Sequence, residues 1–207
     1  MIQLPDDSRC KAFWSWFVNN ASRFRIYQEN QEQEQIFDEI NQQLSTVHPD
    51  LTFEIGPIGP EEPEENDKLD FIVSADGIRE AFPAVERLCK LAPELHGWRV
   101  VCFRPRGNID LPIQMGDAIL KPDDVWFKED FQNDCVDLTL YIKGLSSYEQ
   151  SVLVQLSYLL LDNALGEYDV ETKIGAIERL PLPKNPESEG LKPFRELPAV
   201  VDRHQHG

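Results

Sequence analysis

The stretch SSYEQSVLVQLSYLLLDNALGEYDVET, residues 146–172, decides the fold class of this chain. Its leucine and valine residues recur at three- and four-residue spacing, which predicts an amphipathic helix. Ser146 and Glu149 have the spacing of a capping box at the start of that helix, and Gly166 stands where a helix commonly ends. Apolar and charged residues then alternate over residues 170–177, which predicts a strand directly after the helix.

Other short stretches of the chain also alternate between apolar and polar residues. This period of two is typical of half-buried strands. The first two, residues 51–55 and 69–73, predict an antiparallel hairpin. Residues 98–103 are apolar on both faces apart from Arg99, which predicts a central strand that is covered on two sides. Two further strands are predicted at residues 125–127 and 136–142.

The order of these elements predicts an α+β fold. Helical spacing of apolar residues predicts two helices before residue 48 and another that ends at Pro93. We expect a single, mostly antiparallel sheet of five to seven strands, covered by about four helices. In the terminal tail, Phe194, Leu197 and Val200 are predicted to dock on the rest of the protein. The sequence predicts one domain over residues 1–207, made of a helical pair (1–48), a sheet with two packed helices (49–180) and a proline-rich surface tail (181–207).

The charge of the chain limits its partners. Asp and Glu total 37 against 20 Lys and Arg, a formal net charge of -17. Such a charge repels phosphate backbones and anionic membranes, so we expect no nucleic acid and no membrane as partner. Long-range electrostatics favours a basic protein or a cationic ligand, although solubility alone also explains the charge. The first residues lack the features of a signal peptide, and no apolar run reaches the roughly 18 residues of a membrane span, so a cytoplasmic protein is predicted.

The cysteines and histidines show no metal-binding pattern. The cysteines lie far apart and form no CxxC pair, which predicts reduced thiols. The histidines have no zinc-site spacing, and His204 and His206 are interpreted as part of a terminal tail. We therefore expect no bound metal and no cofactor. The four cysteines are Cys10, Cys89, Cys102 and Cys135.

The first candidate site is an acidic junction at the end of the 146–172 stretch. In the predicted strand, three of its carboxylates lie on one side, where they bind a divalent metal or hold one acid of raised pKa beside an ionised base. A solvated sheet face in an acid-rich chain is the alternative, and the composition favours it. The junction consists of Asp162, Glu167, Asp169 and Glu171.

A second candidate lies in residues 74–80, where a strand leads through a turn into a helix. Asp76 is predicted to cap that helix, and the helix start with Arg79 nearby is a candidate anion site. The segment has one glycine and none of the glycine-rich phosphate-binding motifs, so nucleotide binding has little support.

The third candidate is a compact basic cluster in an acidic chain, formed by Arg99, Arg104 and Arg106. Arg104 follows the predicted central strand, at the end where sheet proteins often bind ligands, and an arginine there clamps a carboxylate or phosphate. Alternatively, it pairs with the acidic junction as a structural ion pair.

Three segments of the chain resemble an uncharacterised family of bacterial proteins. They are SADGIREAFP (residues 74–83), WRVVCFRPR (98–106) and LDNALGEYDVET (161–172). The resemblance extends from the helix around Trp14 to Val200 and implies a bacterial cytoplasmic protein. The family carries no assigned chemistry, so the resemblance implies no catalytic residues.

Three functional hypotheses follow from the sequence. The leading one is a non-enzymatic interaction protein, of accessory or immunity-like type, that engages a basic protein through an acidic face. The alternative is an enzyme or small-ligand binder whose pocket joins Asp76, Arg104, Glu167 and Asp169 at the strand ends. A third is a self-associating subunit that uses an exposed Trp16.

Overall fold

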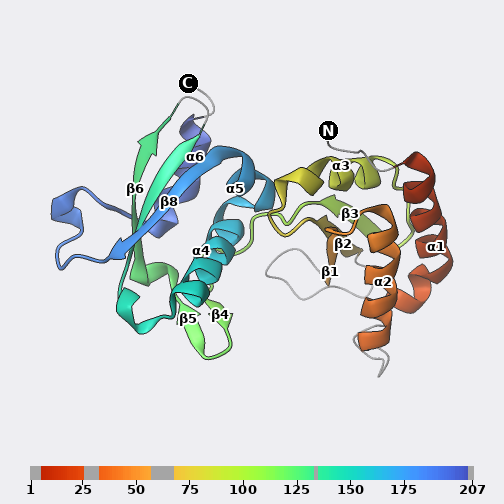
Figure 1. The fold of residues 1–207 in the computed structure, drawn as a ribbon, viewed down its shortest axis with the longest axis horizontal. Coiled ribbons are helices and arrows are strands. Elements are labelled where there is room, and N and C mark those ends of the chain that lie inside the picture. Colours follow the sequence, from red (N-terminus) through yellow and green to blue (C-terminus); the bar gives the residue numbers. More distant parts are fainter. Residues whose placement is uncertain (1–5, 26–32, 57–67, 133–134, 205–207) are drawn as a thin grey trace. The chain divides into compact units, whose positions relative to one another are not determined.

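The computed structural model describes residues 6–25, 33–56, 68–132 and 135–204. The chain divides into two compact units, Met1–Arg104 and Pro105–Gly207. Each unit has its own cluster of buried apolar side chains, carried by the helices and strands that Figure 1 labels. The described residues thus form two apolar cores.

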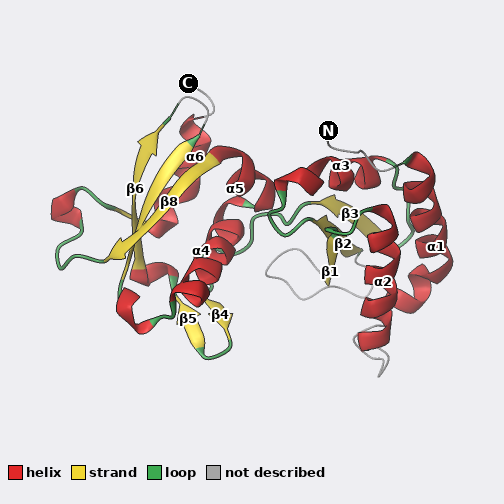
Figure 2. Ribbon diagram, in the orientation of Figure 1, coloured by secondary structure: helices red, strands yellow, loops and turns green. Residues whose placement is uncertain are grey.

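The first unit is built on a three-stranded sheet in the order β1-β2-β3 (Figure 2). Strand β1 is antiparallel to β2, which confirms the predicted hairpin, and β3 is parallel to β2. The parallel pair is connected through α3, as a β-α-β unit requires. The elements are α1 (Asp7–Arg25), α2 (Gln33–Val47), β1 (Thr52–Gly56), β2 (Leu69–Ser74), the 3-10 helix η2 (Arg79–Ala81), α3 (Phe82–Lys90) and β3 (Trp98–Cys102).

Aromatic side chains fill the core of the first unit. Helix α1 buries the stripe that its three/four spacing predicts, and the ring of Phe17 lies 4.6 Å from that of Phe71 on the central strand. Trp14 is also buried, and its indole N–H donates a hydrogen bond of 2.8 Å to the carbonyl of Leu88 on α3. Trp16 is half-buried against Phe24, so the prediction that it is exposed is wrong.

The second unit contains a four-stranded sheet in the order β8-β7-β6-β9 and a separate small hairpin, β4-β5. Strand β7 is antiparallel to β6 and parallel to β8. The strands are β4 (Ile113–Met115), β5 (Ala118–Leu120), β6 (Val125–Phe131), β7 (Val136–Ile142), β8 (Ile174–Pro181) and β9 (Lys192–Pro193). The helices are α4 (Gln150–Leu165), α5 (Glu167–Lys173) and α6 (Leu197–His204), with 3-10 turns η3 (Pro122–Asp124), η4 (Leu145–Ser147), η5 (Glu187–Glu189) and η6 (Phe194–Glu196).

The core of the second unit lies between one face of this sheet and the helices. Every second residue of β7 is buried, and these side chains share one cluster with the leucines of α4 and the apolar residues of α6. Phe194, Leu197 and Val200 belong to the same cluster, so their predicted docking is confirmed. The tail also contributes β9 to the sheet, which the sequence did not predict.

The prediction of one sheet with five to seven strands is wrong, because the strands form sheets of three, two and four. The chain between β3 and β6 supplies only β4 and β5, which pair with each other. In chain order, β3 is therefore the last strand of one sheet and β6 is the first strand of another. In addition, β3 is an edge strand rather than a central one, and Arg99 on it pairs with the buried Asp70 at 2.7 Å.

The boundaries around α4 differ from the prediction as well. Glu149 is the N-cap residue but makes no side-chain capping bond, and Ser146 lies in η4, so the expected capping box does not form. Gly166 ends α4 with a φ of 81°, as expected. The strand expected to begin at residue 170 begins at Ile174, because α5 intervenes.

Among the described residues, no helix combines the length and the apolar character that a membrane crossing requires. Three further predictions lie wholly or partly outside the described residues: polar opening turns of the second helix at residues 28–35, a connector at 56–67 and a turn at 133–134. His206 of the predicted terminal tail lies outside them as well.

Replacing Phe71 tests the aromatic core of the first unit. Phe71→Ala removes a fully buried ring, and we expect the free energy of unfolding to fall by about 3–5 kcal/mol, measured by denaturant titration. Val18→Ala is the control, because Val18 lies on the exposed side of α1, and its effect stays within about 0.5 kcal/mol. Equal losses in the two variants contradict the assigned core.

Candidate functional site

The candidate residues predicted from the sequence belong to different units. Four of them, Asp76, Arg79, Arg99 and Arg104, lie in the first unit. The other five lie in the second unit: Arg106, Asp162, Glu167, Asp169 and Glu171.

Arg104 is held by carboxylates at the end of β3. Its guanidinium donates hydrogen bonds to Glu54 of β1 and to Asp76. Because both partners lie in the same unit, Arg104 closes an ion-pair group at the end of this sheet.

Asp76 does not cap a helix, contrary to the prediction. It lies in a turn closed by the hydrogen bond from Ile78 N–H to the carbonyl of Ala75, and its own φ is 49°. Helix α3 begins only at Phe82, where Pro83 occupies the first turn. Arg79 lies exposed on η2 and has no ion pair within the described part of the chain.

Arg106 is the centre of a second ion-pair group. It donates hydrogen bonds to Asp202 on α6 at 2.7 Å and to Asp169 on α5 at 2.9 Å. Its Nε also donates to the carbonyl of Leu165 at 3.0 Å, which satisfies an acceptor in the last turn of α4. The hydrogen bonds with Asp202, and secondly those with Asp169, raise the pKa of Arg106. One guanidinium thus ties together three helices.

The acidic junction does not form the predicted row of carboxylates. Glu167, Asp169 and Glu171 lie on α5, where a spacing of two residues turns a side chain to another side of the helix. Glu167 is fully buried, whereas Asp169 pairs with Arg106 and with Lys173, at 2.5 Å from the latter. Asp162 is half-buried on α4. No group of three or more His, Cys, Asp or Glu side chains in the described ranges has a geometry suited to a metal ion.

A different surface joins side chains that the sequence treats as unrelated. In the second unit, the sheet has a face turned away from the core, which we call the open face. The strand register places one row of apolar and aromatic residues across all four strands of that face. The members of this aromatic row are Leu180 on β8, Tyr141 on β7, Trp126 on β6 and Pro193 on β9, and each of them is half-buried.

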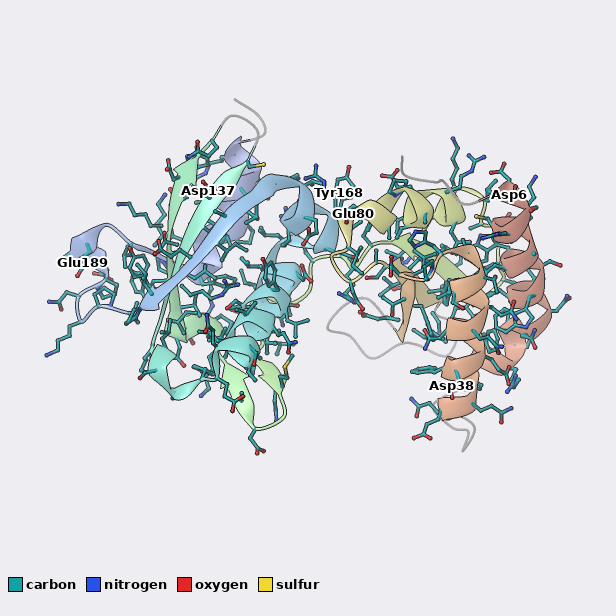
Figure 3. All side chains as sticks on the ribbon, viewed as in Figure 1. Asp6, Asp38, Glu80, Asp137, Tyr168 and Glu189 are labelled. Atoms are coloured by element: carbon teal, nitrogen blue, oxygen red, sulfur yellow. The ribbon has the colours of Figure 1, made fainter. Side chains whose placement is uncertain are left out.

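Charged and polar residues occupy the rest of the open face. The row next to the aromatic one contains Glu178, Thr139 and Lys128, and beyond it Asp130 stands opposite Asp137. Asp137, labelled in Figure 3, accepts a hydrogen bond of 2.7 Å from the backbone N–H of Ala176. That bond lies beside the irregular register of β7 and β8, so Asp137 also has a structural part. The open face therefore combines an apolar strip with a margin in which carboxylates outnumber the single lysine.

The sequence patterns did not lead to this surface, although one of its strands can be recognised in the sequence. Alternation over residues 136–142 already separates Asp137, Thr139 and Tyr141 from the buried side of the strand. The sequence does not say which residues of β6, β8 and β9 lie beside them, because that depends on the register of non-local pairs.

No family model, no curated protein and no solved structure matches this chain. The resemblance of three segments to an uncharacterised bacterial family therefore stays a prediction, and the site is argued from its own chemistry.

Replacing Arg106 tests its role in holding three helices together. Arg106→Gln removes the charge that binds Asp169 and Asp202, and we expect the free energy of unfolding to fall by about 1–2 kcal/mol, less at high salt. Arg203→Gln is the matched control, because Arg203 donates only to the Ala199 carbonyl of its own helix. A denaturant titration that finds the same small loss of unfolding free energy for both variants contradicts the role of Arg106 in holding α4, α5 and α6 together.

Proposed function

We propose that this chain is a non-enzymatic interaction protein, of accessory or immunity-like type, whose second unit binds a basic protein segment through the open face. The observation that carries the proposal is the aromatic row, which crosses four strands beside a carboxylate-rich margin. Tryptophan and tyrosine are the residues most often found at the energetic centre of protein interfaces. Carboxylates at the margin favour a partner of opposite charge.

The charge distribution of the second unit supports a basic partner. Many of its cations are already paired with carboxylates, so they contribute little positive potential to an approaching protein. With a net charge of -17 for the whole chain, long-range attraction favours basic proteins and opposes acidic ones. The paired cations are Arg106, Lys143, Lys173, Lys192 and Arg195.

The alternative, an enzyme or small-ligand binder, has less support. Its pocket was expected to use arginine to bind the ligand, yet Arg104 and Arg106 both pair with carboxylates of their own units. An arginine that is already neutralised in this way has less affinity left for an incoming carboxylate or phosphate, because the ligand must displace an existing partner. The proposal of an interaction protein needs no such displacement.

Binding of a defined basic probe tests the proposal. The probe is a short peptide of alternating lysine and leucine, and the indole N–H signal of Trp126, assigned with Trp126→Phe, is followed by NMR. We expect this signal to shift on titration and the affinity to fall as salt rises. Trp126→Thr is expected to weaken binding by about 30-fold, since a central anchor is worth about 2 kcal/mol or more. Glu178→Gln is expected to weaken it by about threefold, as a margin charge does.

Tyr168→Thr is the matched control, because Tyr168 is an exposed aromatic residue on α5, outside the open face (Figure 3). We expect it to bind the peptide as the unchanged protein does. A peptide of alternating glutamate and leucine provides the charge control and is expected not to bind. The proposal is wrong if both peptides bind equally, or if Tyr168→Thr and Trp126→Thr lose the same affinity.

A further inference from the structure

The longest strand among the described residues lies at an edge of its sheet. Strand β8 has eight residues, and within the described ranges it pairs with β7 on one side only. The N–H of Leu182, directly after β8, donates to the carbonyl of Ile142 on β7. Successive residues of a strand turn their backbone groups to opposite sides, so those of Glu178 and Leu180 point to β7 as well.

The backbone groups of Ile177 and Arg179 consequently point to the outer edge of β8. Within the described part of the chain, no other strand pairs with them there. A side-chain contact reaches the edge, since Nη1 of Arg179 donates to the carbonyl of Ile177 at 3.3 Å. Proteins usually cover or shorten such an edge, because it pairs readily with another strand. Pro181, which has no N–H, ends β8, so the free part is short and contains these two residues.

The side chain of Arg179 has an unusual environment. It is half-buried and forms no ion pair with a described residue, although the net charge of the chain is -17. Its Nε donates to the buried Ser157 hydroxyl at 3.0 Å, and its Cζ lies 5.4 Å from the ring centre of Tyr158, an exposed residue of α4. Its Nη2 is buried and has no acceptor within the described residues. Because a half-buried charge is normally paired, this guanidinium suits a carboxylate from outside the unit.

Opposite charges lie on the two sides of this edge. Glu178 is exposed on the open face and forms no ion pair with a described residue. Arg179 lies on the other face, where the register places it beside Leu140. The residues before and after them, Ile177 and Leu180, are apolar and half-buried. A strand that pairs with this edge therefore meets an apolar, an acidic, a basic and an apolar residue in succession.

We propose that the outer edge of β8 is a docking site for an extended segment of a partner protein. In that segment one acidic and one basic residue are adjacent, and apolar residues flank them. Its backbone pairs with Ile177 and Arg179, as an added strand does at a sheet edge. Its cation lies opposite Glu178 on the open face, and its carboxylate lies opposite Arg179 on the other face. Opposite charges directly across two strands stabilise their pairing.

A second copy of this chain fits the edge less well. In a second copy, Glu178 turns its backbone groups to its own β7, so it cannot lie opposite Arg179 in a paired strand. A two-fold register centred on Glu178 or on Arg179 places like charges opposite each other, which is destabilising. A register centred on Ile177 leaves both charges unpaired. A partner segment has no such restriction, because neither of its sides is already paired.

Hydrogen exchange of single amides, followed by NMR on the full chain, tests the free edge. We expect the amides of Ile177 and Arg179 to exchange at least about tenfold faster than those of Glu178 and Leu180, which are bonded to β7. The probe is the peptide Thr-Val-Glu-Lys-Val-Thr. At saturation it is expected to slow exchange at Ile177 and Arg179 and to leave the other two amides unchanged.

Two outcomes of this experiment overturn the proposal. Slow exchange of the Ile177 and Arg179 amides without peptide means that the chain itself covers the edge. Protection that rises with protein concentration means that a second copy occupies it.

A peptide of the same composition tests the charge pattern. In Thr-Glu-Val-Lys-Val-Thr the two charges are two positions apart, so they point to one face of an added strand and cannot reach both Glu178 and Arg179. We expect this peptide to bind about fivefold more weakly, since it loses one cross-strand ion pair. Equal affinity of the two peptides overturns the proposal.

A double-mutant cycle assigns the peptide carboxylate to Arg179. Changing the peptide Glu to Gln, or Arg179→Gln in the protein, is expected to weaken binding about fivefold, and the two changes together no further, because both remove one ion pair. Arg203→Gln is the control and is expected to bind the peptide as the unchanged protein does. Additive losses overturn the assignment. Where Arg179→Gln folds poorly, the Gln peptide decides on the unchanged protein, and an unchanged affinity contradicts the proposal.

Trp126→Thr separates this site from the aromatic row. We expect this variant to keep its affinity for Thr-Val-Glu-Lys-Val-Thr, because Trp126 lies on β6, two strands away from β8. The edge site can thus fail while binding at the open face holds, and the reverse. A loss in Trp126→Thr as large as that in Arg179→Gln places the peptide on the open face and overturns the proposal.

Discussion

Burial of one side of β7 is the constraint on which the proposed interface depends. Val136, Leu138, Leu140 and Ile142 are all buried, and a shift of one residue in the register moves all four into solvent. The loss of burial for four such side chains amounts to several kcal/mol, so the register is strongly fixed. The opposite side of β7 is therefore fixed as well, and Tyr141 lies beside Trp126 as a consequence of core packing.

Ion pairs join separate segments of the chain in both units. Arg106 satisfies a helix-end carbonyl and two carboxylates from two other helices, so it holds elements together. At the end of the first sheet, Arg104 neutralises Glu54 and Asp76, which come from segments far apart in the sequence. In both groups the guanidinium is already paired with carboxylates of its own unit. The acidic residues in excess over such pairs are the ones that give the protein its long-range field.

Local patterns predicted many of the elements, but not their partners. The stripe of α1, the helix α4 and the alternation of β7 follow from periodicity, because each buries one side against a core. The grouping into three separate sheets was missed, since a strand pattern such as residues 98–103 does not reveal whether the strand has one neighbour or two. Helix α5 was taken for a strand because Val170 and Ile174 are compatible with both periods over so short a segment.

For the candidate sites too, local patterns indicated the residue types but not the residues that contact them. Residue types indicated that Arg104 and Arg106 would find carboxylates, yet the identity of those carboxylates depended on the fold. Asp76 looked like a helix cap because a strand, a turn and a helix follow one another in the sequence. The left-handed turn, with η2 before α3, moved the N-cap from Asp76 to Ala81, five residues further on.

In the proposed complex, affinity and selectivity at the open face would have separate physical sources. Covering Trp126 and Tyr141 removes apolar surface from water, and this gain is indifferent to the charge of the partner. The carboxylates around the row contribute little to the affinity of the final complex, because exposed ion pairs are worth about 0–1 kcal/mol each. Their main effect is on the encounter, since they accelerate the approach of basic proteins and slow that of acidic ones. An apolar row alone would bind many partners weakly, and the acidic margin restricts them to one electrostatic class.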